Sequence, residues 1–346
     1  MSNVNVPSGV IFGCASLSLT DEEKEFFARV NPVGFILFAR NVDTPEQVAA
    51  LVDSLRQTTG RADVPVLIDQ EGGRVQRLKA PHWEALPAGR RFGELYEKDA
   101  DKGREAAFLN ARYIGMTLAE LGIDVDCLPL LDLPRKDADL IIGDRAFSSR
   151  VDETADLGVS VCEGLMESGV LPIVKHIPGH GRATADSHKE LPVVTADLET
   201  LKKTDFAPFK MLAHAPWAMT AHVMYTAVDD ENPASLSEKV VRGIIRDYIG
   251  FDGFLICDDL SMKALNGDFA DLTRRALAAG CDAVLHCNGD MNEMKAVAQG
   301  VSPLSEKSLA RLEKSYAAKK KAALHASAKD KDEIRARVLN LLNGDA

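Results

Sequence analysis

The sequence predicts an α/β protein built as a closed (β/α)8 barrel of the TIM type, with extra helices at its C-terminus. Three observations lead to this prediction: short apolar runs recur along the whole chain, helical patterns separate them, and 346 residues suit a single barrel. The runs are hydrophobic almost throughout, which is typical of parallel strands buried on both faces. A doubly wound open sheet fits the same alternation, but eight strand and helix units favour the closed barrel.

The predicted strands and helix starts follow directly from these runs. The strands cover residues 10–15, 33–39, 64–70, 124–133, 170–176, 217–225, 253–259 and 282–288. Capping sequences at 20–23, 44–47 and 235–238 mark helix starts, because Ser or Thr precedes Glu or Gln there. We expect residues 305–346 to form terminal helices packed on the barrel. Because no linker or repeat divides the sequence, we expect residues 1–346 to form one catalytic domain.

Composition and charge narrow the class of protein. The chain has 41 Lys and Arg against 52 Asp and Glu, a formal net charge of −11, and 46% hydrophobic residues. The hydrophobic content is typical of a folded globular protein. The net negative charge would repel nucleic acid and anionic membranes. We therefore expect a small-molecule substrate and neither nucleic acid nor membrane as a partner. The basic run Lys319–Lys321 is assigned to a solvated helix face.

Cysteine usage and the N-terminal sequence point to a cytoplasmic protein. The six cysteines form no CxxC pair and lie mostly in apolar runs, so we expect buried free thiols rather than disulfides or structural zinc. No basic residue precedes the first apolar segment, which is not typical of a secretory signal, and no apolar run reaches about 18 residues. We expect no cofactor, and we favour a monomer.

Residues 175–192, KHIPGHGRATADSHKELP, are the most informative segment. A polar loop of this length after a barrel strand is expected to be functional. Asp186 and His188 are separated by one residue, so in an extended stretch the carboxylate can hold the imidazole in one tautomer. This pair is a candidate general acid/base. The alternative is that His188 only bonds a backbone carbonyl.

The same loop offers ligands for a divalent metal. His176, His180, Asp186 and His188 have suitable side chains, and the first two have i, i+4 spacing. However, a Pro-Gly pair lies between those two histidines and interrupts the helix on which such ligands converge. We therefore expect no metal site.

The segment GFLICDDLSM supplies a candidate nucleophile. Side chains alternate along a strand, so only one of Asp258 and Asp259 can point into the barrel mouth. A carboxylate that faces an acid/base group across a cleft is the equipment for cleaving a glycosidic bond. The alternative for Asp259 is a structural role in capping the next helix.

The sequence DQEGGRVQR follows another predicted strand and offers groups that suit sugar hydroxyls. Asp69, Glu71, Arg74 and Arg77 supply donors and acceptors, and the paired glycines are expected to allow close backbone approach to a ligand. Arg145, in GDRAF, is a further donor, although the residue taken on its own is better explained by a surface salt bridge.

Taken together, KHIPGHGRATADSH, DQEGGRVQR, IGDRAF and GFDGFLICDDLS resemble glycoside hydrolase family 3, and within it the NagZ-type β-N-acetylglucosaminidases. The motifs occur in the order that the family has them. The resemblance implies a retaining β-hexosaminidase that removes terminal, non-reducing N-acetylglucosamine through a covalent glycosyl-enzyme intermediate. It also implies action in the cytoplasm on muropeptides that carry 1,6-anhydro-N-acetylmuramic acid, during peptidoglycan recycling.

The resemblance also assigns roles to residues. It implies that Asp258 is the nucleophile, His188 the general acid/base and Asp186 the partner of that histidine. The positions that match the family's sugar-binding residues are Asp69, Arg77, Arg145, Lys175 and His176. The chain departs from the family pattern at Cys257, where Ser or Thr is usual, and at Tyr248, where a charged or amide residue is usual.

Three other functions remain open at this stage. A phosphorylase would use the same site with phosphate as acceptor, because a histidine repels that anion less than a glutamate does. A metal-dependent hydrolase would lose activity on chelation. A non-catalytic sugar-binding protein would keep the arginines and Lys175 without needing the acid/base pair, and both members of that pair are present.

Overall fold

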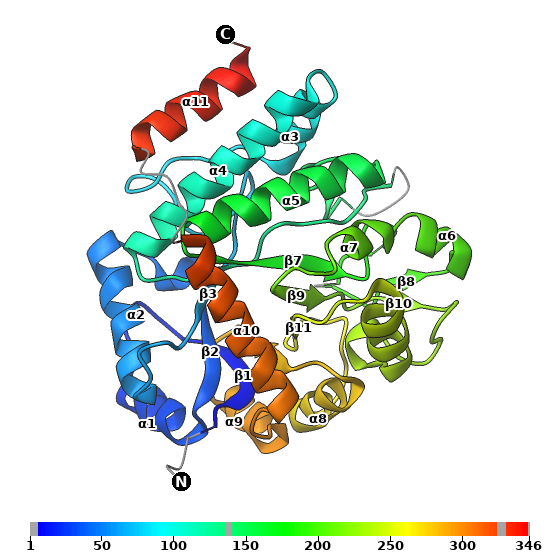
Figure 1. Cartoon of the computed structure of the whole chain (residues 1–346). Coiled ribbons are helices and arrows are strands. Elements are labelled where there is room, and N and C mark those ends of the chain that lie inside the picture. The colour runs from blue at the N-terminus through cyan, green and yellow to red at the C-terminus, as the bar shows by residue number, and fades with distance from the viewer. Residues whose placement is uncertain (1–5, 136–139, 184, 188, 324–329, 345–346) are drawn as a thin grey trace.

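A computed structural model describes residues 6–135, 140–183, 185–187, 189–323 and 330–344, and it shows the predicted closed barrel of eight parallel strands (Figure 1). Around the barrel the strands follow one another in chain order, and the first strand pairs with the last. The strands are β1 (Ser8–Gly13), β2 (Pro32–Leu37), β3 (Val66–Ile68), β6 (Val125–Asp126), β7 (Leu171–Ile177), β9 (Trp217–Thr220), β11 (Phe254–Asp259) and β12 (Ala283–His286).

Helices surround this barrel on the outside (Figure 1). They are α1 (Asp21–Val30), α2 (Pro45–Thr59), α3 (Gly89–Tyr96), α4 (Ala100–Glu120), α5 (Val151–Glu167), α6 (Leu198–Lys203), α7 (Ala207–Met211), α8 (Phe269–Ala279), α9 (Met291–Gly300), α10 (Glu306–Ala323) and α11 (Lys331–Asn343). The helical turns η1 (Ala39–Asn41), η2 (Gly143–Arg145) and η3 (Ala234–Leu236) and the π-helix η4 (Lys239–Ile249) complete the set. No described helix is long and apolar enough to cross a membrane.

The capping sequences begin helices for the predicted reason. Thr20 and Glu23 form a reciprocal capping box at α1, and the Thr44 side chain accepts a hydrogen bond from the backbone of Gln47 at α2. The third start is one turn later than predicted. There Ser237 accepts from the backbone N–H of Val240 through its hydroxyl, so the helix follows η3 instead of beginning at residue 235.

Side-chain alternation along β11 determines which aspartate faces the barrel interior. Phe254 and Ile256 belong to the core inside the barrel, whereas Leu255 and Cys257 belong to the core between the strands and the outer helices. Continuing this alternation places Asp258 on the interior side.

Helix α10 covers the N-terminal end of the barrel. Leu312 joins the interior core, and Ser315 accepts a hydrogen bond of 3.0 Å from the indole of Trp217, the first residue of β9. Arg311 forms an ion pair of 2.9 Å with Asp282, next to the start of β12. With this end filled by side chains, the C-terminal end of the strands is the open end, where barrel enzymes place their chemistry.

Six of the eight predicted strands are longer than the strands observed, and three of them show how the extra residues are used. The run 64–70 ends as β3, and its last residue, Gln70, begins the hairpin of β4 (Gln70–Gly72) and β5 (Val75–Gln76). The run 124–133 contains only β6, and the run 217–225 ends as β9. Beyond β9, β10 (Met224–Tyr225) pairs with β8 (Val193–Val194) outside the barrel.

Candidate functional site

A cavity of about 230 Å³ lies at the C-terminal end of the barrel strands. Its walls come from the ends of β7 and β11, the hairpin of β4 and β5, and η2. Of the eight residues predicted to form the site, six line this cavity: Asp69, Arg77, Arg145, Lys175, His176 and Asp258. Asp186 does not line it, and His188 lies outside the described residues.

A buried network of charges forms one wall of the cavity. The ammonium group of Lys175, which is only 2% exposed, lies 2.9 Å from Asp69 and 2.6 Å from Glu71. Arg77 forms a 2.9 Å ion pair with Asp69, and Arg145 binds Glu71 through two hydrogen bonds of 2.8 and 2.9 Å. Arg145 is therefore part of a buried, bidentate ion pair rather than a surface salt bridge.

The protonation states in this network are determined by its geometry. Burial by itself raises the pKa of both carboxyl groups, but Lys175 and the two arginines outweigh it. The pKa of Asp69 lies well below its usual range, and that of Glu71 falls to about 2. Burial lowers the pKa of Lys175, but Asp69 and Glu71 reverse this effect and raise it above its usual value. All these groups are therefore charged at neutral pH.

Asp132 orients the histidines of the 175–192 loop. Its carboxylate lies 2.7 Å from Nδ1 of His176 and accepts a 2.6 Å hydrogen bond from the backbone N–H of His180. Donation from Nδ1 leaves Nε2 of His176 as the nitrogen that can meet a ligand. Asp132 was not singled out from the sequence, although it carries the same signal as Asp258, an acid that follows an apolar run.

His180 is a second buried histidine at this position. Its ring packs edge-on against that of His176, with centroids 5.7 Å apart, and its Nε2 lies 3.3 Å from the hydroxyl of Ser187. Burial, and then the neighbouring His176, lower the pKa of His180 to about 4. His180 is therefore neutral at physiological pH.

The two aspartates at the end of β11 have different surroundings. Both line the cavity, but the two carboxylate oxygens of Asp259 are occupied by local hydrogen bonds. One oxygen accepts from the backbone N–H groups of Ser261 at 3.0 Å and Cys287 at 3.1 Å, and the other accepts from the Ser261 hydroxyl at 2.6 Å. Asp258 accepts the backbone N–H of Asp259 at 2.8 Å. Asp259 thus holds the strand end in place.

Residues behind the strand also support this pair. Nε2 of the buried His222 lies 3.0 Å from the backbone carbonyl of Asp259, and its Nδ1 lies 2.7 Å from the hydroxyl of Ser235. Cys257, where the family pattern has a hydroxyl, faces away from the cavity, and its sulfur accepts from the backbone N–H of Leu285 at 3.4 Å. The Cys257 thiol therefore contacts the neighbouring strand β12 and not a ligand in the cavity.

The described part of the loop before position 188 lies against the cavity. Ser187 lines it, and the Ser187 backbone carbonyl accepts a 3.0 Å hydrogen bond from Ala264, in the segment that follows β11. The carboxylate of Asp186 lies 3.6 Å from the ammonium group of Lys189. Ser187 is thus placed next to the segment that follows Asp258.

Glycines allow the close backbone contacts that shape the site. A Cβ at Gly181 would lie 2.0 Å from the backbone oxygen of Leu133, so only glycine fits there. Gly72 and Gly73 have positive φ values of 96° and 55° and form the turn between β4 and β5. A Cβ at Gly72 would lie 2.4 Å from the backbone oxygen of Pro87. The paired glycines thus shape this hairpin.

Within the described residues, no three His, Cys, Asp or Glu side chains group as metal ligands. Of the four residues considered from the sequence as ligands, His176 directs Nδ1 at Asp132 and His180 packs against that ring. His188, the fourth, lies outside the described part of the chain.

Comparisons with known proteins agree with this architecture. Residues 4–317 match the Glycosyl hydrolase family 3 N terminal domain. The chain is 37% identical over 286 residues to a beta-hexosaminidase of Bordetella avium, covering 82% of this chain and 81% of that protein. It is 35% identical over 308 residues to a beta-hexosaminidase of Methylobacillus flagellatus, covering 88% and 87%. The crystal structure of NagZ from Neisseria gonorrhoeae in complex with N-trifluoroacetyl-D-glucosamine superposes with a TM-score of 0.86 and 31% identity, covering 97% and 98%.

Proposed function

Because this chain belongs to glycosyl hydrolase family 3 and is a β-N-acetylglucosaminidase, we propose that it is a retaining enzyme whose nucleophile is Asp258. The observation that carries the proposal is the contrast at the end of β11. Asp258 lies on the interior side of the strand and lines the cavity, while both oxygens of Asp259 are used in local hydrogen bonds. Attack by Asp258 on the anomeric carbon gives a covalent glycosyl-enzyme intermediate.

His188 is proposed as the general acid/base. Protonated His188 gives its proton to the departing glycosidic oxygen, and as neutral imidazole it then takes a proton from the water that releases the sugar. Asp186 stabilises the imidazolium and so raises the pKa of that histidine. The contact of Ser187 with the cavity and with Ala264 supports this placement, because it brings the neighbouring backbone next to the segment after Asp258.

The charge network is proposed to hold the sugar. Asp69 is ionised and can accept hydrogen bonds from hydroxyl groups, while Arg77 and Lys175 donate from fixed positions. Arg145 lines the same wall, and His176 presents the ring nitrogen that Asp132 leaves available. Such pre-positioned groups orient a ligand at low entropic cost.

The proposed substrates are muropeptides in which N-acetylglucosamine is linked to 1,6-anhydro-N-acetylmuramic acid, cleaved in the cytoplasm during peptidoglycan recycling. The resemblance of the motifs to NagZ-type enzymes supports this assignment. The Neisseria protein with a similar fold was solved with an N-acylated glucosamine, which supports an N-acetylated sugar in this cavity. We further propose that residues 1–346 act as one catalytic domain, with residues 305–346 as its terminal helices, in a monomer.

The decisive experiment is to trap the intermediate. Wild-type protein and His188→Ala are incubated with a β-N-acetylglucosaminide that has a good leaving group, and the peptide that contains Asp258 is examined by mass spectrometry. His188→Ala should accumulate a sugar adduct on Asp258, and Asp258→Ala should show neither adduct nor turnover. Absence of the adduct from both the wild type and His188→Ala would contradict the assignment of Asp258 as nucleophile. It would favour attack by the 2-acetamido group of the substrate.

Two further assays define the reaction class. Hydrolysis of a chromogenic β-N-acetylglucosaminide should far exceed that of the β-glucoside analogue, and equal rates would contradict a requirement for the acetamido group. Product analysis with and without inorganic phosphate separates hydrolysis from phosphorolysis, since only the latter yields a sugar 1-phosphate.

A further inference from the structure

His222 is a fully buried histidine next to the end of β11. It follows β9, the strand that pairs with β11, and it does not line the cavity at the C-terminal end of the barrel. Its Nε2 lies 3.0 Å from the backbone carbonyl of Asp259, and its Nδ1 lies 2.7 Å from the hydroxyl of Ser235. Any effect of His222 on a ligand in the cavity must therefore pass through its neighbours.

The two contacts of His222 determine which ring nitrogen carries the hydrogen. Burial lowers the pKa of His222 and the nearby Asp258 only partly offsets this effect, so the ring is neutral at physiological pH. A backbone carbonyl can only accept, so Nε2 carries the hydrogen and donates it to Asp259. Nδ1 therefore accepts from the hydroxyl of Ser235, which holds His222 in the tautomer that binds the carbonyl.

Ser235 is itself held in place by the fold. It is fully buried within η3. The backbone N–H of the preceding Ala234 donates to the carbonyl of Val223, the residue after His222, at 2.8 Å. The thiol of Cys281 lies 3.9 Å from the backbone carbonyl of Ser235. The Ser235 hydroxyl is thus presented to His222 by a fixed backbone.

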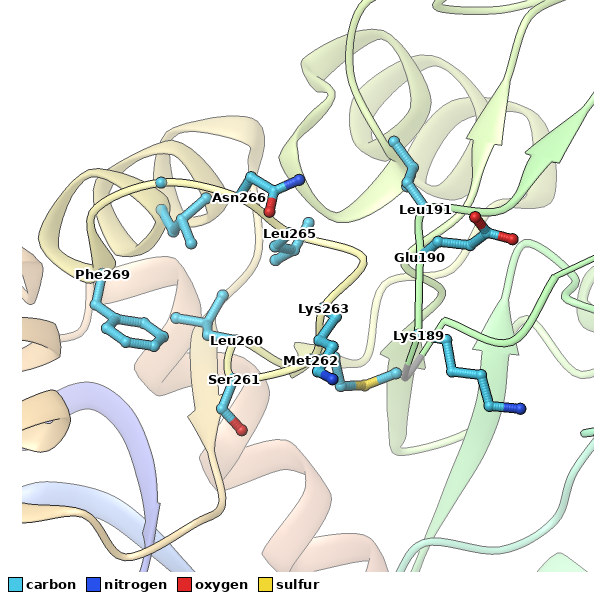
Figure 2. Close-up of a pocket in the computed structure, with 12 residues that line it drawn as sticks. Lys189, Glu190, Leu191, Leu260, Ser261, Met262, Lys263, Leu265, Asn266 and Phe269 are labelled. Carbon is cyan, nitrogen blue, oxygen red and sulfur yellow. The ribbon is translucent and has the colours of Figure 1, made fainter.

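The Asp259 carbonyl is a junction at the end of β11. Besides Nε2 of His222, it accepts the backbone N–H of Met262 at 3.1 Å, which closes the turn after the strand. Ser261 and Met262, labelled in Figure 2, belong to this turn. Because the Asp259 carboxylate is also bound locally, residue 259 is fixed both at its carbonyl and at its side chain.

The backbone N–H of Asp259 points at the carboxylate of Asp258. It donates to Oδ1 of Asp258 at 2.8 Å. Such a bond favours the ionised form of a carboxylate and restricts its rotation. The direction of this N–H depends on the orientation of residue 259, which His222 helps to fix.

We propose that His222 is a positioning residue for the reaction. By holding the carbonyl of Asp259 it fixes the N–H that orients the carboxylate of Asp258, and Ser235 sets the tautomer in which it does so. This inference rests on the proposed function, in which Asp258 is the nucleophile. Attack requires a carboxylate oxygen in line with the anomeric carbon, so a rotated carboxylate slows the reaction while the sugar still binds.

The test compares two amides at position 222. His222→Gln keeps a donor near the place of Nε2, whereas His222→Asn reaches only to the place of Nδ1 and loses the bond to Asp259. An aryl β-N-acetylglucosaminide gives kcat, and calorimetry gives Kd for N-acetylglucosamine. His222→Asn should lower kcat about tenfold, as expected for one buried hydrogen bond, and change Kd by less than about twofold. His222→Gln should retain at least about a third of the wild-type kcat.

Ser235→Ala tests the tautomer. Without the hydroxyl, the neutral ring of His222 can carry its hydrogen on either nitrogen, so kcat should fall about threefold. Ser160→Ala is the matched control. It removes another buried hydroxyl, which donates to the backbone carbonyl of Asp156 within α5 at 3.1 Å, and it should leave kcat unchanged.

The outcomes separate this inference from the proposed function. Equal kcat in His222→Gln and His222→Asn would overturn the positioning role, because a histidine that only fills space would not distinguish the two amides. A parallel loss of kcat and of affinity for N-acetylglucosamine in His222→Asn would overturn it as well. If His222→Asn does not fold, a wild-type kcat in Ser235→Ala overturns the proposal instead. A wild-type protein that does not cleave the aryl substrate contradicts the proposed function itself.

Discussion

The carboxylate of Asp132 lies 2.7 Å from Nδ1 of His176 and also accepts the backbone N–H of His180. One buried acid therefore sets both the tautomer of a cavity histidine and the path of the backbone that follows it. Burial raises the pKa of Asp132, but His176 outweighs this effect and the net shift is downward, so the group is ionised at neutral pH.

Asp132→Asn should therefore lower kcat/KM. The amide keeps the shape but removes the charge that orients His176, and one charge-assisted hydrogen bond is worth about 1.5 kcal/mol, or about tenfold in kcat/KM. Steady-state kinetics on an aryl β-N-acetylglucosaminide measure this change. Because the site is buried, urea unfolding is measured alongside, and Asp132→Glu tests rescue. An unchanged kcat/KM in a folded Asp132→Asn protein would refute the positioning role.

Glu71 should stabilise the fold through its contacts with Arg145 and Lys175. Glu71→Gln leaves two buried cations with one fewer counter-charge, which should cost about 3 kcal/mol in the free energy of unfolding. The exposed pair of Lys24 and Asp21 offers a matched control, because Asp21→Asn should change stability by less than about 1 kcal/mol. A similar, small effect at both positions would show that the buried pair contributes little.

The Glu71 carboxylate should also make the free energy of unfolding depend on pH in the acidic range. Its pKa falls from the usual value of 4.5 to about 2 on folding, so its stabilising contribution is complete above about pH 4.5 and is lost as pH falls toward 2. Thermal unfolding of wild type and Glu71→Gln across this range should show the steeper decline in the wild type. Parallel curves would contradict the assigned shift.

His180 should make the free energy of unfolding depend on pH in a second, higher range. Its pKa falls from 6.5 to about 4 on folding, so between these values the unfolded chain binds a proton that the folded protein does not. The free energy of unfolding should therefore fall as pH drops from 6.5 to 4, and His180→Gln should flatten this slope. His82→Gln, at an exposed histidine, should leave the slope of the wild type unchanged. An identical slope in His180→Gln would refute the prediction.

Gly181 should tolerate no side chain. Gly181→Ala would place a Cβ 2.0 Å from the backbone oxygen of Leu133, so the loop before position 188 must move, and both stability and kcat/KM should fall. A Cβ at Gly243, within η4, would have no heavy atom within 4 Å, so Gly243→Ala should be neutral or slightly stabilising. Equal stability of the two variants would show that the backbone near Leu133 shifts to accommodate a Cβ at position 181 at little energetic cost.

Much of the fold could be predicted because buried parallel strands leave a simple signal. Each of the eight apolar runs overlaps one barrel strand, and the capping sequences at Thr20 and Thr44 begin helices as predicted. The lengths of six of the strands could not be predicted in this way. An apolar run such as 124–133 is buried whether or not its backbone pairs with neighbouring strands. Within this run only the two residues of β6 pair with β3 and β7 as a regular strand.

The site was harder to predict because its partners are far apart in the sequence. The sequence pointed to Asp69, Lys175 and Arg145 one by one, but not to Glu71 as the acid shared by Lys175 and Arg145. Asp132 was missed because its role depends on the spacing between β6 and β7 in three dimensions, which no local pattern encodes. The close approach of Gly72 to Pro87 could not be predicted either, because Pro87 lies 15 positions further along the chain.

The pairing of β1 with β12 has a consequence for how the protein is made. Val10 lies opposite Val284, so the ring of strands stays open until most of the chain has been synthesised. Contacts between such distant positions are slow to form, because the intervening chain loses much entropy when they do. A nascent chain therefore carries one unpaired edge of its first strand for most of its synthesis, and that edge is where association with another chain would begin.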